Sequence, residues 1–259
     1  MTSPADRWSQ QLADWAIEPE ILAAAPESPW GFPPEMFRAD SSPGDGPTRQ
    51  RVREALDSHR ATVLDVGSGG GAASVPTLRP GVSAVAVDES AEMLAAYAAA
   101  ASATGAAVRA VQGSWPEVAD EAGPAEVVVC ANVVYNVPDI EPFVWALHRQ
   151  AHRRVVIELT ERHPLTLLGP LWRHFHGHDR PPGPTFGLFC DVLDRLGIEH
   201  RTALSERPSQ FGLSDPEAYA AWTRRRLCLP VDRQPEVRAL LAAQPPPPTR
   251  QVVTVWWDR

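Results

Sequence analysis

A run of apolar residues that ends in a cluster of glycines constrains the fold of this chain more than any other segment. The run spans residues 62–66 and contains one acid, Asp65, and four glycines follow within five positions: Gly67, Gly69, Gly70 and Gly71. Glycine permits the tight positive-φ turn that such a connection needs, and the start of a following helix presents free N–H groups. The segment therefore predicts a strand, a turn and a helix that together bind a ribose or another polar small-molecule group.

Strand-length apolar segments alternate with helix-length segments along most of the chain. We expect strands at 61–66, 82–88, 107–112, 125–130, 154–159, 198–204 and 250–257. We expect helices at 5–17, 19–25, 48–60, 72–78, 90–103, 140–152, 164–176, 185–196, 214–228 and 236–243. Apolar strands that alternate with helices are typical of a parallel sheet with helices on both faces. The pattern therefore predicts an α/β fold.

Two parts of the chain depart from this alternation. Residues 1–48 precede the glycine segment and predict an N-terminal helical cap. Residues 49–259 predict the main domain, with a helical insertion at about 205–249 before the last strand. We therefore expect one domain with an added cap.

The aromatic residues of the cap allow two interpretations. Trp8, Leu12 and Trp15 recur at helical spacing, and residues 29–37, which include Trp30 and Phe32, are rich in aromatics and prolines. The stripe indicates either a helix docked on the core or a lid over a bound ligand. The sequence leaves both open.

Composition limits the classes of partner. The chain of 259 residues carries a net charge of −8, which argues against general nucleic-acid binding because such proteins usually present a basic face. Its three cysteines form no paired motif, which favours a reducing compartment. We find neither a signal-peptide pattern nor an apolar run long enough for a membrane span. We therefore expect a cytoplasmic protein without a membrane partner, monomeric or homodimeric.

Two acids mark the expected ligand site. Asp65 precedes the glycines, and Asp88 ends the second expected strand, where an acid can bind both hydroxyls of a ribose. Gly67, Gly69 and Ala72 also satisfy the G-x-G-x-x-A pattern of dinucleotide sites. The glycines alone therefore do not distinguish between cofactor classes.

Four segments carry a resemblance to a known family. DVGSGGG (65–71) resembles the D/E-x-G-x-G-x-G motif of class I S-adenosylmethionine-dependent methyltransferases, whereas dinucleotide folds typically have an apolar residue at the position of Asp65. AVAVDES (84–90) is similar to the family's ribose-binding strand end, QGSWPEV (112–118) to its adenine segment, and CANVVYNVPDI (130–140) to the fourth-strand end of its small-molecule members. The resemblance implies a seven-stranded, mostly parallel Rossmann-like sheet whose last strand is antiparallel.

The same resemblance implies S-adenosyl-L-methionine as cofactor and a small-molecule acceptor. The residues it assigns to cofactor binding are Asp65, Gly67, Ser68, Gly69, Gly71, Asp88, Glu89, Met93, Gly113, Ser114, Trp115 and Asn132. Asp88 would hold the ribose, Ser114 and Trp115 would flank the adenine, and Asn132 would lie beside the methionine. Many relatives have an acid at the position of Ser114, which puts adenine recognition by this serine in doubt.

A general base is needed only if the acceptor arrives protonated. The ends of the fourth and fifth strands offer His163, Tyr135 and Glu161 as catalytic residues, with His163 preferred. Asn136 and Glu158 lie in the same segments, and Glu158 and Glu161 could instead favour a cationic cofactor by their charge.

Structural interpretations compete with several of these assignments. Asp88 could cap a strand end, Trp115 could be a core aromatic, Asn132 a turn residue and His163 a loop histidine. The histidines at 174, 176 and 178 do not share one helical face, so we expect no metal site, and Arg224–Arg226 is typical of a solvated helix face. An NAD(P)-dependent oxidoreductase and a cofactor-binding protein without catalysis remain alternatives to the methyltransferase.

Overall fold

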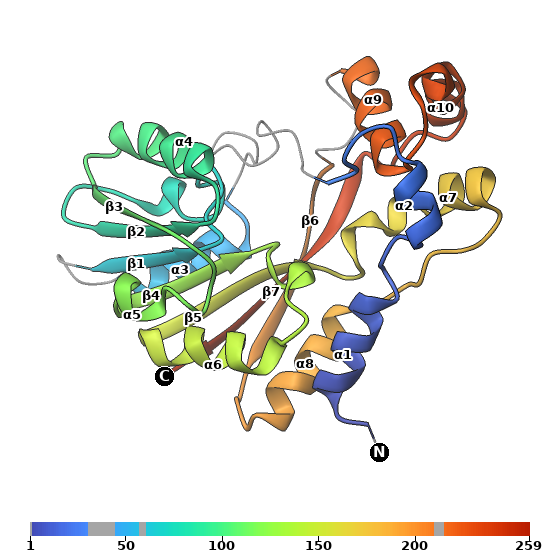
Figure 1. Ribbon diagram of the computed structural model, residues 1–259. Coiled ribbons are helices and arrows are strands. Elements are labelled where there is room, and N and C mark those ends of the chain that lie inside the picture. Colours follow the sequence, from blue (N-terminus) through green and yellow to red (C-terminus); the bar gives the residue numbers. More distant parts are fainter. Residues whose placement is uncertain (1, 31–44, 57–60, 210–214) are drawn as a thin grey trace.

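The computed structural model describes residues 2–30, 45–56, 61–209 and 215–259. Its centre is a seven-stranded sheet in the order β3-β2-β1-β4-β5-β7-β6 (Figure 1). The strands are β1 (Thr62–Val66), β2 (Ser83–Asp88), β3 (Ala107–Gln112), β4 (Ala125–Ala131), β5 (Ala151–Thr160), β6 (Arg201–Pro208) and β7 (Thr249–Asp258). Strand β7 runs antiparallel to both β5 and β6, and the other neighbouring pairs are parallel. The expected Rossmann-like sheet with an antiparallel last strand is confirmed.

Helices cover both faces of the sheet. They are α1 (Pro4–Ala13), α2 (Pro19–Ala24), α3 (Pro47–Ala55), α4 (Ala91–Ser102), α5 (Ala119–Ala122), α6 (Ile140–Gln150), α7 (Gly169–His176), α8 (Phe186–Arg195), α9 (Pro216–Arg226) and α10 (Gln234–Ala243). One large apolar core joins the sheet to α6 and α8, and a second joins the opposite face to α3 and α4. Within the described residues, no helix is long and apolar enough to cross a membrane.

Helices α2, α7, α9 and α10 form a smaller lobe beside the sheet (Figure 1). Two satellite apolar clusters hold it together, one around Tyr219 and Trp222 of α9 and the other around Trp172 of α7. Ile17 and Ile21 of the N-terminal segment pack against the second cluster. The lobe therefore combines the N-terminal segment with helices that follow β5 and β6.

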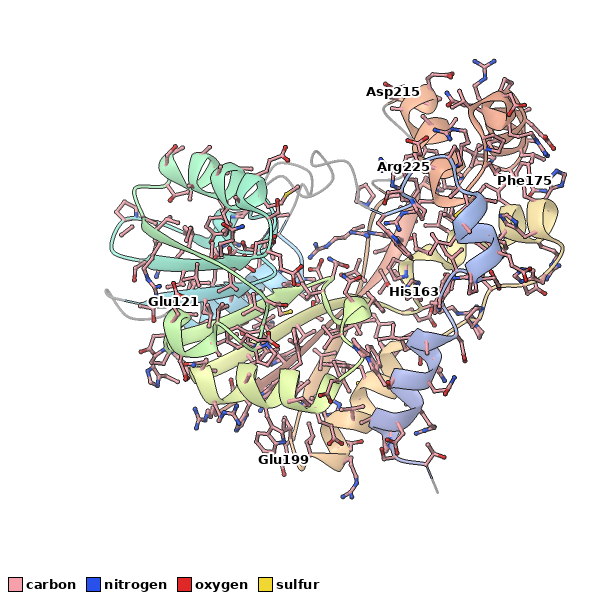
Figure 2. The ribbon with its side chains drawn as sticks, in the orientation of Figure 1. Glu121, His163, Phe175, Glu199, Asp215 and Arg225 are labelled. Carbon is pink, nitrogen blue, oxygen red and sulfur yellow. The ribbon has the colours of Figure 1, made fainter. Side chains whose placement is uncertain are left out.

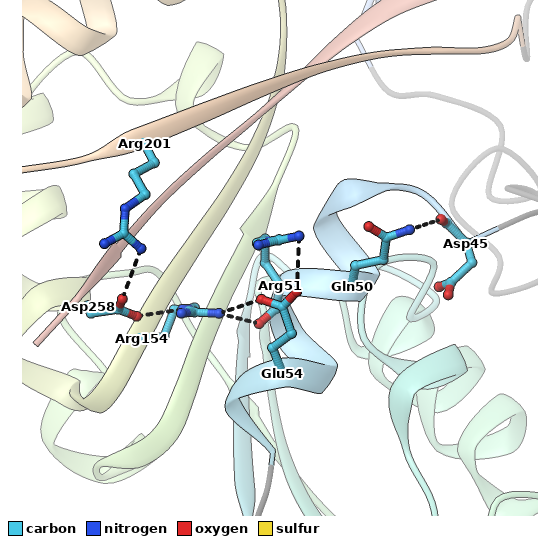
Figure 3. Close-up of polar contacts among 7 residues, drawn as sticks. All are labelled: Asp45, Gln50, Arg51, Glu54, Arg154, Arg201 and Asp258. Carbon is cyan, nitrogen blue, oxygen red and sulfur yellow. Dashed lines mark hydrogen bonds and ion pairs between the residues drawn. The ribbon is translucent and has the colours of Figure 1, made fainter.

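Ion pairs tie α3 to the amino-terminal end of β5 (Figure 3). The guanidinium of Arg154 contacts Glu54 of α3 at 3.1 Å and Asp258 of β7 at 2.6 Å. Arg51 and Arg201 supplement these two acids at 3.0 and 3.4 Å. Because the Arg154 side chain is only 12% exposed, these pairs fix α3 on the sheet more firmly than surface pairs would. These contacts anchor the last turn of α3 at the amino-terminal edge of the sheet.

Helix α1 is docked on the main core. Trp8 is fully buried, donates from its indole Nε1 to the carbonyl oxygen of Val137 at 2.9 Å, and packs against Tyr135 and Phe189. Trp15 is also buried, whereas Trp30 is 53% exposed. Of the two interpretations that the sequence allows, a docked helix and a lid, the position of Trp8 agrees with the docked helix. Phe32 and the rest of 31–37 lie outside the described residues.

The structure shifts several expected boundaries. The predicted strand 198–204 is wrong at both ends. Strand β6 begins later because Gly197, at φ 71°, ends α8 and the Ile198 N–H donates back to the carbonyl of Leu193. It extends to Pro208 because its pairing with β7 continues to Thr249. The predicted helix 72–78 is reduced to a 3-10 turn at Val75–Thr77, and the helix 164–176 divides into a 3-10 turn at Pro164–Leu168 and α7. Pro76 and Pro164 stand at the starts of these turns, where proline is favoured.

Other boundaries move by a few residues. Helix α1 ends at Ala13 rather than at residue 17, and α6 ends at Gln150 because β5 begins at Ala151. A short helix, α5, and 3-10 turns at Val134–Asn136 and Val231–Arg233 were not predicted. Residues 57–60 of the predicted helix 48–60 and Ser214 lie outside the described part of the chain.

We predict that Trp8→Ala lowers the free energy of unfolding by about 3–5 kcal/mol, because it removes a large buried side chain and an indole hydrogen bond. Chemical denaturation monitored by circular dichroism gives the value. Trp30→Ala is the matched control and should change stability by less than about 0.5 kcal/mol, since surface substitutions are usually near neutral. Equal stabilities for the two variants would contradict the docked position of α1.

Candidate functional site

The loop after β1 adopts the conformation that its glycines predict. Gly67, Gly69 and Gly71 have φ values of 66°, 50° and 89°. A Cβ on Gly67 would lie 2.3 Å from a methyl group of Val133, and one on Gly71 would lie 2.3 Å from a methyl group of Val75. The protein's own packing therefore accounts for the absence of a side chain at these two glycines.

Ser68 is the residue of this loop whose side chain lacks a protein partner. It is buried, its backbone N–H donates to the carbonyl of Val87 at 2.9 Å, and its hydroxyl makes no hydrogen bond within the described chain. A buried hydroxyl without a partner is costly unless a ligand or water completes it. This geometry fits a polar ligand held against the loop.

Asp65 lies beneath the loop in a buried hydrogen-bond chain. Its Oδ2 accepts from the hydroxyl of Ser74 at 2.5 Å, and the Ser74 hydroxyl lies 2.7 Å from the hydroxyl of Tyr97. Burial raises the pKa of Asp65 to about 7, while the Ser74 hydrogen bond opposes the rise and the charge of Asp88 adds to it. Asp65 therefore holds Ser74, and with it the segment that follows the glycine loop, in place.

Asp88 joins the end of β2 to the loop. Its Oδ2 accepts from the Gly69 N–H at 2.8 Å, and its Oδ1 accepts from the Ser90 N–H at 2.9 Å. The capping role considered from the sequence is thus present. A carboxylate has about four acceptor positions, so two remain for a pair of hydroxyls such as those of a ribose. Asp88 is half-buried and can serve both purposes.

The residues expected on the adenine side lie together beyond β2 and β3. The Ser114 hydroxyl donates to Glu89 Oε1 at 2.6 Å, and Gln112 donates to the Glu89 carbonyl at 3.0 Å. Gly113 donates from its N–H to the Asp88 carbonyl at 3.0 Å. Met93 is half-buried in the first turn of α4, which Ser90 caps. These contacts place Ser114 and Glu89 as one polar pair beside Asp88.

Trp115 and Asn132 both have structural partners. Trp115 packs partly buried against the main core and donates to the Phe143 carbonyl at 3.4 Å. Asn132 follows β4 with a φ of 61°, donates from its N–H to the Glu158 carbonyl at 2.8 Å, and its side-chain amide lies 3.4 Å from Glu158 Oε1. The core and turn interpretations thus account for their positions, and their contacts with a cofactor stay predictions.

His163 lies in an aromatic stack where the chain leaves β5, beside α1 (Figure 2). Its ring stacks on Trp15 with centroids 4.0 Å apart and meets the edge of Tyr135 at 5.3 Å. Its Nδ1 accepts from the Leu165 N–H at 3.3 Å, which leaves the proton of the neutral ring on Nε2. Burial, followed by the charges of Arg180 and Arg226, lowers its pKa to about 3.

Tyr135 and Glu161 differ in surroundings. The Tyr135 hydroxyl donates to the Thr160 carbonyl and accepts from the Thr160 N–H, both at 2.8 Å. Burial raises the pKa of Tyr135 well above its usual value. Glu161 is exposed. The structure thus brings His163 and Tyr135 together, and the catalytic roles of all three residues stay predictions.

Several polar residues of this region were missed from the sequence. Ser74 and Tyr97 complete the Asp65 chain, and Thr48 donates to Glu158 at 2.5 Å. Tyr97 is the one aromatic residue of the alanine-rich helix α4, a signal that the sequence offered. Thr48 and Glu158 lie 110 positions apart, and nothing local to either predicts their contact.

The three histidines at 174, 176 and 178 each contact a different partner. His174 lies 3.0 Å from Glu236, His176 lies 2.9 Å from the Leu227 carbonyl, and His178 lies 3.6 Å from Glu18. No group of three or more possible metal ligands occurs in the part of the chain that the structure describes. Arg224 and Arg226 are buried, so the predicted solvated face is wrong for two of the three arginines.

Comparison with solved structures shows the same fold in known enzymes. One is an S-adenosylmethionine-dependent methyltransferase from Geobacter sulfurreducens, solved with S-adenosylhomocysteine, which is 18% identical to this chain and has a TM-score of 0.52. The alignment covers 88% of this chain and 99% of that enzyme. One from Thiobacillus denitrificans, solved with the same molecule, is 15% identical with a TM-score of 0.51, and 87% of this chain covers 97% of it. At these identities the likeness establishes the fold.

Sequence comparison adds the family. Residues 63–153 match a family described as a methyltransferase domain, and this range spans the glycine loop, Asp88 and the end of β4. Residues 63–153 are thus similar to a methyltransferase domain, and the fold around them is that of the two solved enzymes. No match is found among curated protein sequences. The matched range ends at Arg153, so most of β5 and everything after it lie outside the matched range.

We predict that the stability of the protein falls as the pH rises from about 4 to about 7. Folded Asp65 keeps its proton up to about pH 7, whereas the unfolded carboxyl has a pKa of 3.8. The unfolded chain therefore binds fewer protons in this window, and the free energy of unfolding declines with pH, by on the order of 4 kcal/mol in total.

Asp65→Asn isolates this contribution because the amide has the same shape and does not titrate. Denaturant titrations at pH 4.5, 6 and 8 should show a smaller decline for Asp65→Asn than for the wild type. Asp120→Asn, an exposed position on α5, should keep the wild-type decline. The same decline in all three proteins would show that Asp65 is ionised in the fold.

Proposed function

We propose that this methyltransferase binds S-adenosylmethionine across the carboxyl ends of β1, β2 and β4 and transfers its methyl group to a small molecule. The observation that carries the proposal is the Asp88 carboxylate, bonded to the loop through Gly69 yet with acceptor positions left for a ribose. The partnerless Ser68 hydroxyl supports a polar ligand on the same loop. Asp65, Gly67 and Gly71 would maintain the loop beneath it.

The remaining cofactor contacts follow the positions already described. Ser114, Glu89 and Gly113 would face the adenine side, with Trp115 and Met93 as the neighbouring apolar surfaces. Asn132, held on Glu158 at the end of β4, would lie beside the methionine part. When bound, the cofactor supplies an electrophilic methyl group on a sulfonium that is already an activated leaving group. The protein's task is then to align the acceptor and to exclude water.

The region around the end of β5, where we place the methyl acceptor, favours a small molecule. Here Trp15 of the N-terminal segment meets the smaller lobe. Arg180 donates to the Ala16 carbonyl at 3.1 Å and places its guanidinium over the rings of Trp15 and Trp172. Trp15 in turn covers His163. A surface closed in this way suits a compact acceptor better than a nucleic acid, as does the net charge of −8.

His163 would act as a base only from its neutral form. With a pKa lowered to about 3 the ring is unprotonated at every physiological pH, yet it holds a proton weakly. This chemistry suits an acceptor whose proton is already acidic, or one that arrives deprotonated. We also infer that the enzyme works in the cytoplasm, in agreement with its three free cysteines.

We predict that isothermal titration calorimetry detects binding of S-adenosylhomocysteine to the wild type. Asp88→Ala should weaken this binding about tenfold or more, because it removes charge-assisted hydrogen bonds to the ribose. Asp120→Ala is the control and should bind as the wild type does. Circular dichroism melts of each variant separate lost binding from lost folding.

Titration with NADH distinguishes the alternative cofactor class. Binding of NADH without binding of S-adenosylhomocysteine would support an oxidoreductase and overturn the proposal. Wild-type affinity in Asp88→Ala would overturn the role of Asp88 alone.

We predict that the His163 ring does not titrate between pH 5 and 8, because its pKa lies near 3. Nuclear magnetic resonance of the ring nitrogens, assigned with His163→Gln, measures this. In Trp15→Ala the stack is removed and water reaches the ring, so the pKa should rise toward its ordinary value of 6.5. A wild-type midpoint between pH 6 and 7 would contradict the buried environment and favour His163 as an ordinary general base.

A further inference from the structure

Arg250 is a partly buried arginine without an acid to neutralise it. It lies near the start of β7, at the carboxyl edge of the sheet, and directly faces Arg207 of β6 in the antiparallel register. Its Nε is buried without a hydrogen-bond partner, and the guanidinium makes no hydrogen bond or ion pair to the described residues. Like charges opposite one another on two strands are destabilising. The fold therefore maintains this arginine at a cost in stability.

Glu158, the acid whose charge acts on Arg250, is already engaged by other groups. Arg207 contacts both of its oxygens, Oε1 at 3.1 Å and Oε2 at 2.9 Å. Thr48 donates to Oε2, and the Asn132 amide lies 3.4 Å from Oε1. Three hydrogen bonds and the ion pair with Arg207 thus engage both oxygens of the carboxylate. The charge of Glu158 still acts on Arg250, yet an anion that binds Arg250 directly must come from outside these contacts.

The position of Arg250 indicates which molecule brings that anion. It lies close enough to Tyr135, in the turn after β4, for the two side chains to interact electrostatically. In the sheet order, β7 is three strands from β1, which is about 14 Å at the usual strand spacing. The glycine loop lies at that distance from Arg250, and Asn132, beside the methionine part of the proposed cofactor, lies two strands away, which is about 10 Å. An anion at Arg250 therefore belongs to the acceptor rather than to the cofactor.

We propose that Arg250 binds a carboxylate of the methyl acceptor, so that the substrate is a small organic acid. The inference rests on the proposed function and specifies its acceptor. One guanidinium matches one carboxylate in a two-pronged, charge-assisted contact, whereas a dianionic phosphate usually engages more than one cation. The acid is anchored at β7, and its methyl-accepting atom then extends toward Asn132 at the end of β4.

Nuclear magnetic resonance of the arginine Nε–H groups tests this without knowledge of the substrate. The buried Nε–H of Arg250 is assigned by its loss in Arg250→Met, and acetate is titrated into the full-length protein with and without S-adenosylhomocysteine. Acetate should shift the Arg250 resonance in a saturable way, and its affinity should fall about tenfold or more in Arg250→Met. Arg250→Lys should retain part of the affinity.

Matched probes and a matched variant make the result specific. Acetamide has the shape of acetate without its charge and should leave the resonance unchanged. Arg201→Met, on the same sheet but 68% exposed at the opposite edge, should bind acetate as the wild type does. Equal acetate binding by Arg250→Met and the wild type would overturn the proposal, as would binding of inorganic phosphate but not of acetate.

The affinity for S-adenosylhomocysteine separates this inference from the proposed function. If that molecule binds and acetate does not reach Arg250, only the acid acceptor is wrong. If Arg250→Met weakens S-adenosylhomocysteine binding tenfold and acetate competes with it, then Arg250 holds the cofactor's own carboxylate and the inference is overturned. If S-adenosylhomocysteine does not bind at all, the proposed function fails, while acetate at Arg250 would still establish a carboxylate site.

Discussion

The buried carboxylate of Glu158 is the interaction on which the acceptor side of this protein depends. Its side chain is 5% exposed, and it receives contacts from α3, from the turn after β4 and from β6. Through Thr48 it also reaches Thr254 of β7, since the two hydroxyls lie 2.8 Å apart. Removing one partner of such a buried charge typically costs about 3–5 kcal/mol. Glu158 thereby sets the relative positions of Asn132 and Arg207, which lie 75 positions apart in the sequence.

The cofactor side is built differently, from residues close together in sequence. Asp65, Gly69 and Asp88 lie within 24 positions, and every contact among them involves β1, β2 or the loop between them. A strand, a glycine turn and an acid at the next strand end carry their own geometry, because parallel strands bring their carboxyl ends to one edge. The strand, the glycine turn and the acid could therefore be predicted from local patterns, whereas the seven-stranded sheet with its antiparallel last strand was predicted from the resemblance to a known family.

The acceptor half could not be predicted in this way because its contacts join distant segments. Tyr135, His163 and Glu158 were recognised as polar residues at strand ends, but their surroundings depend on Trp15 and Arg207, far away in the chain. The sequence offers no local signal that Trp15 will cover His163 or that Arg207 will occupy Glu158. Arg250 was seen only as the first residue of a closing strand, since its isolation follows from which acids its neighbours have already engaged.

The two halves also differ in charge, and this difference agrees with the chemistry of methyl transfer. Asp65 has a hydroxyl partner, Ser74, rather than a cation, and burial is the main cause of its raised pKa. Asp88 and Glu89 make the β1–β2 side of the edge acidic, which favours a positively charged sulfonium cofactor. Beyond β5, Arg226 is buried with its pKa lowered to about 10, and Arg180 and Arg250 lie in the same region. An edge that is negative at one end and positive at the other orients a cationic methyl donor and an anionic acceptor toward each other before any contact forms between them.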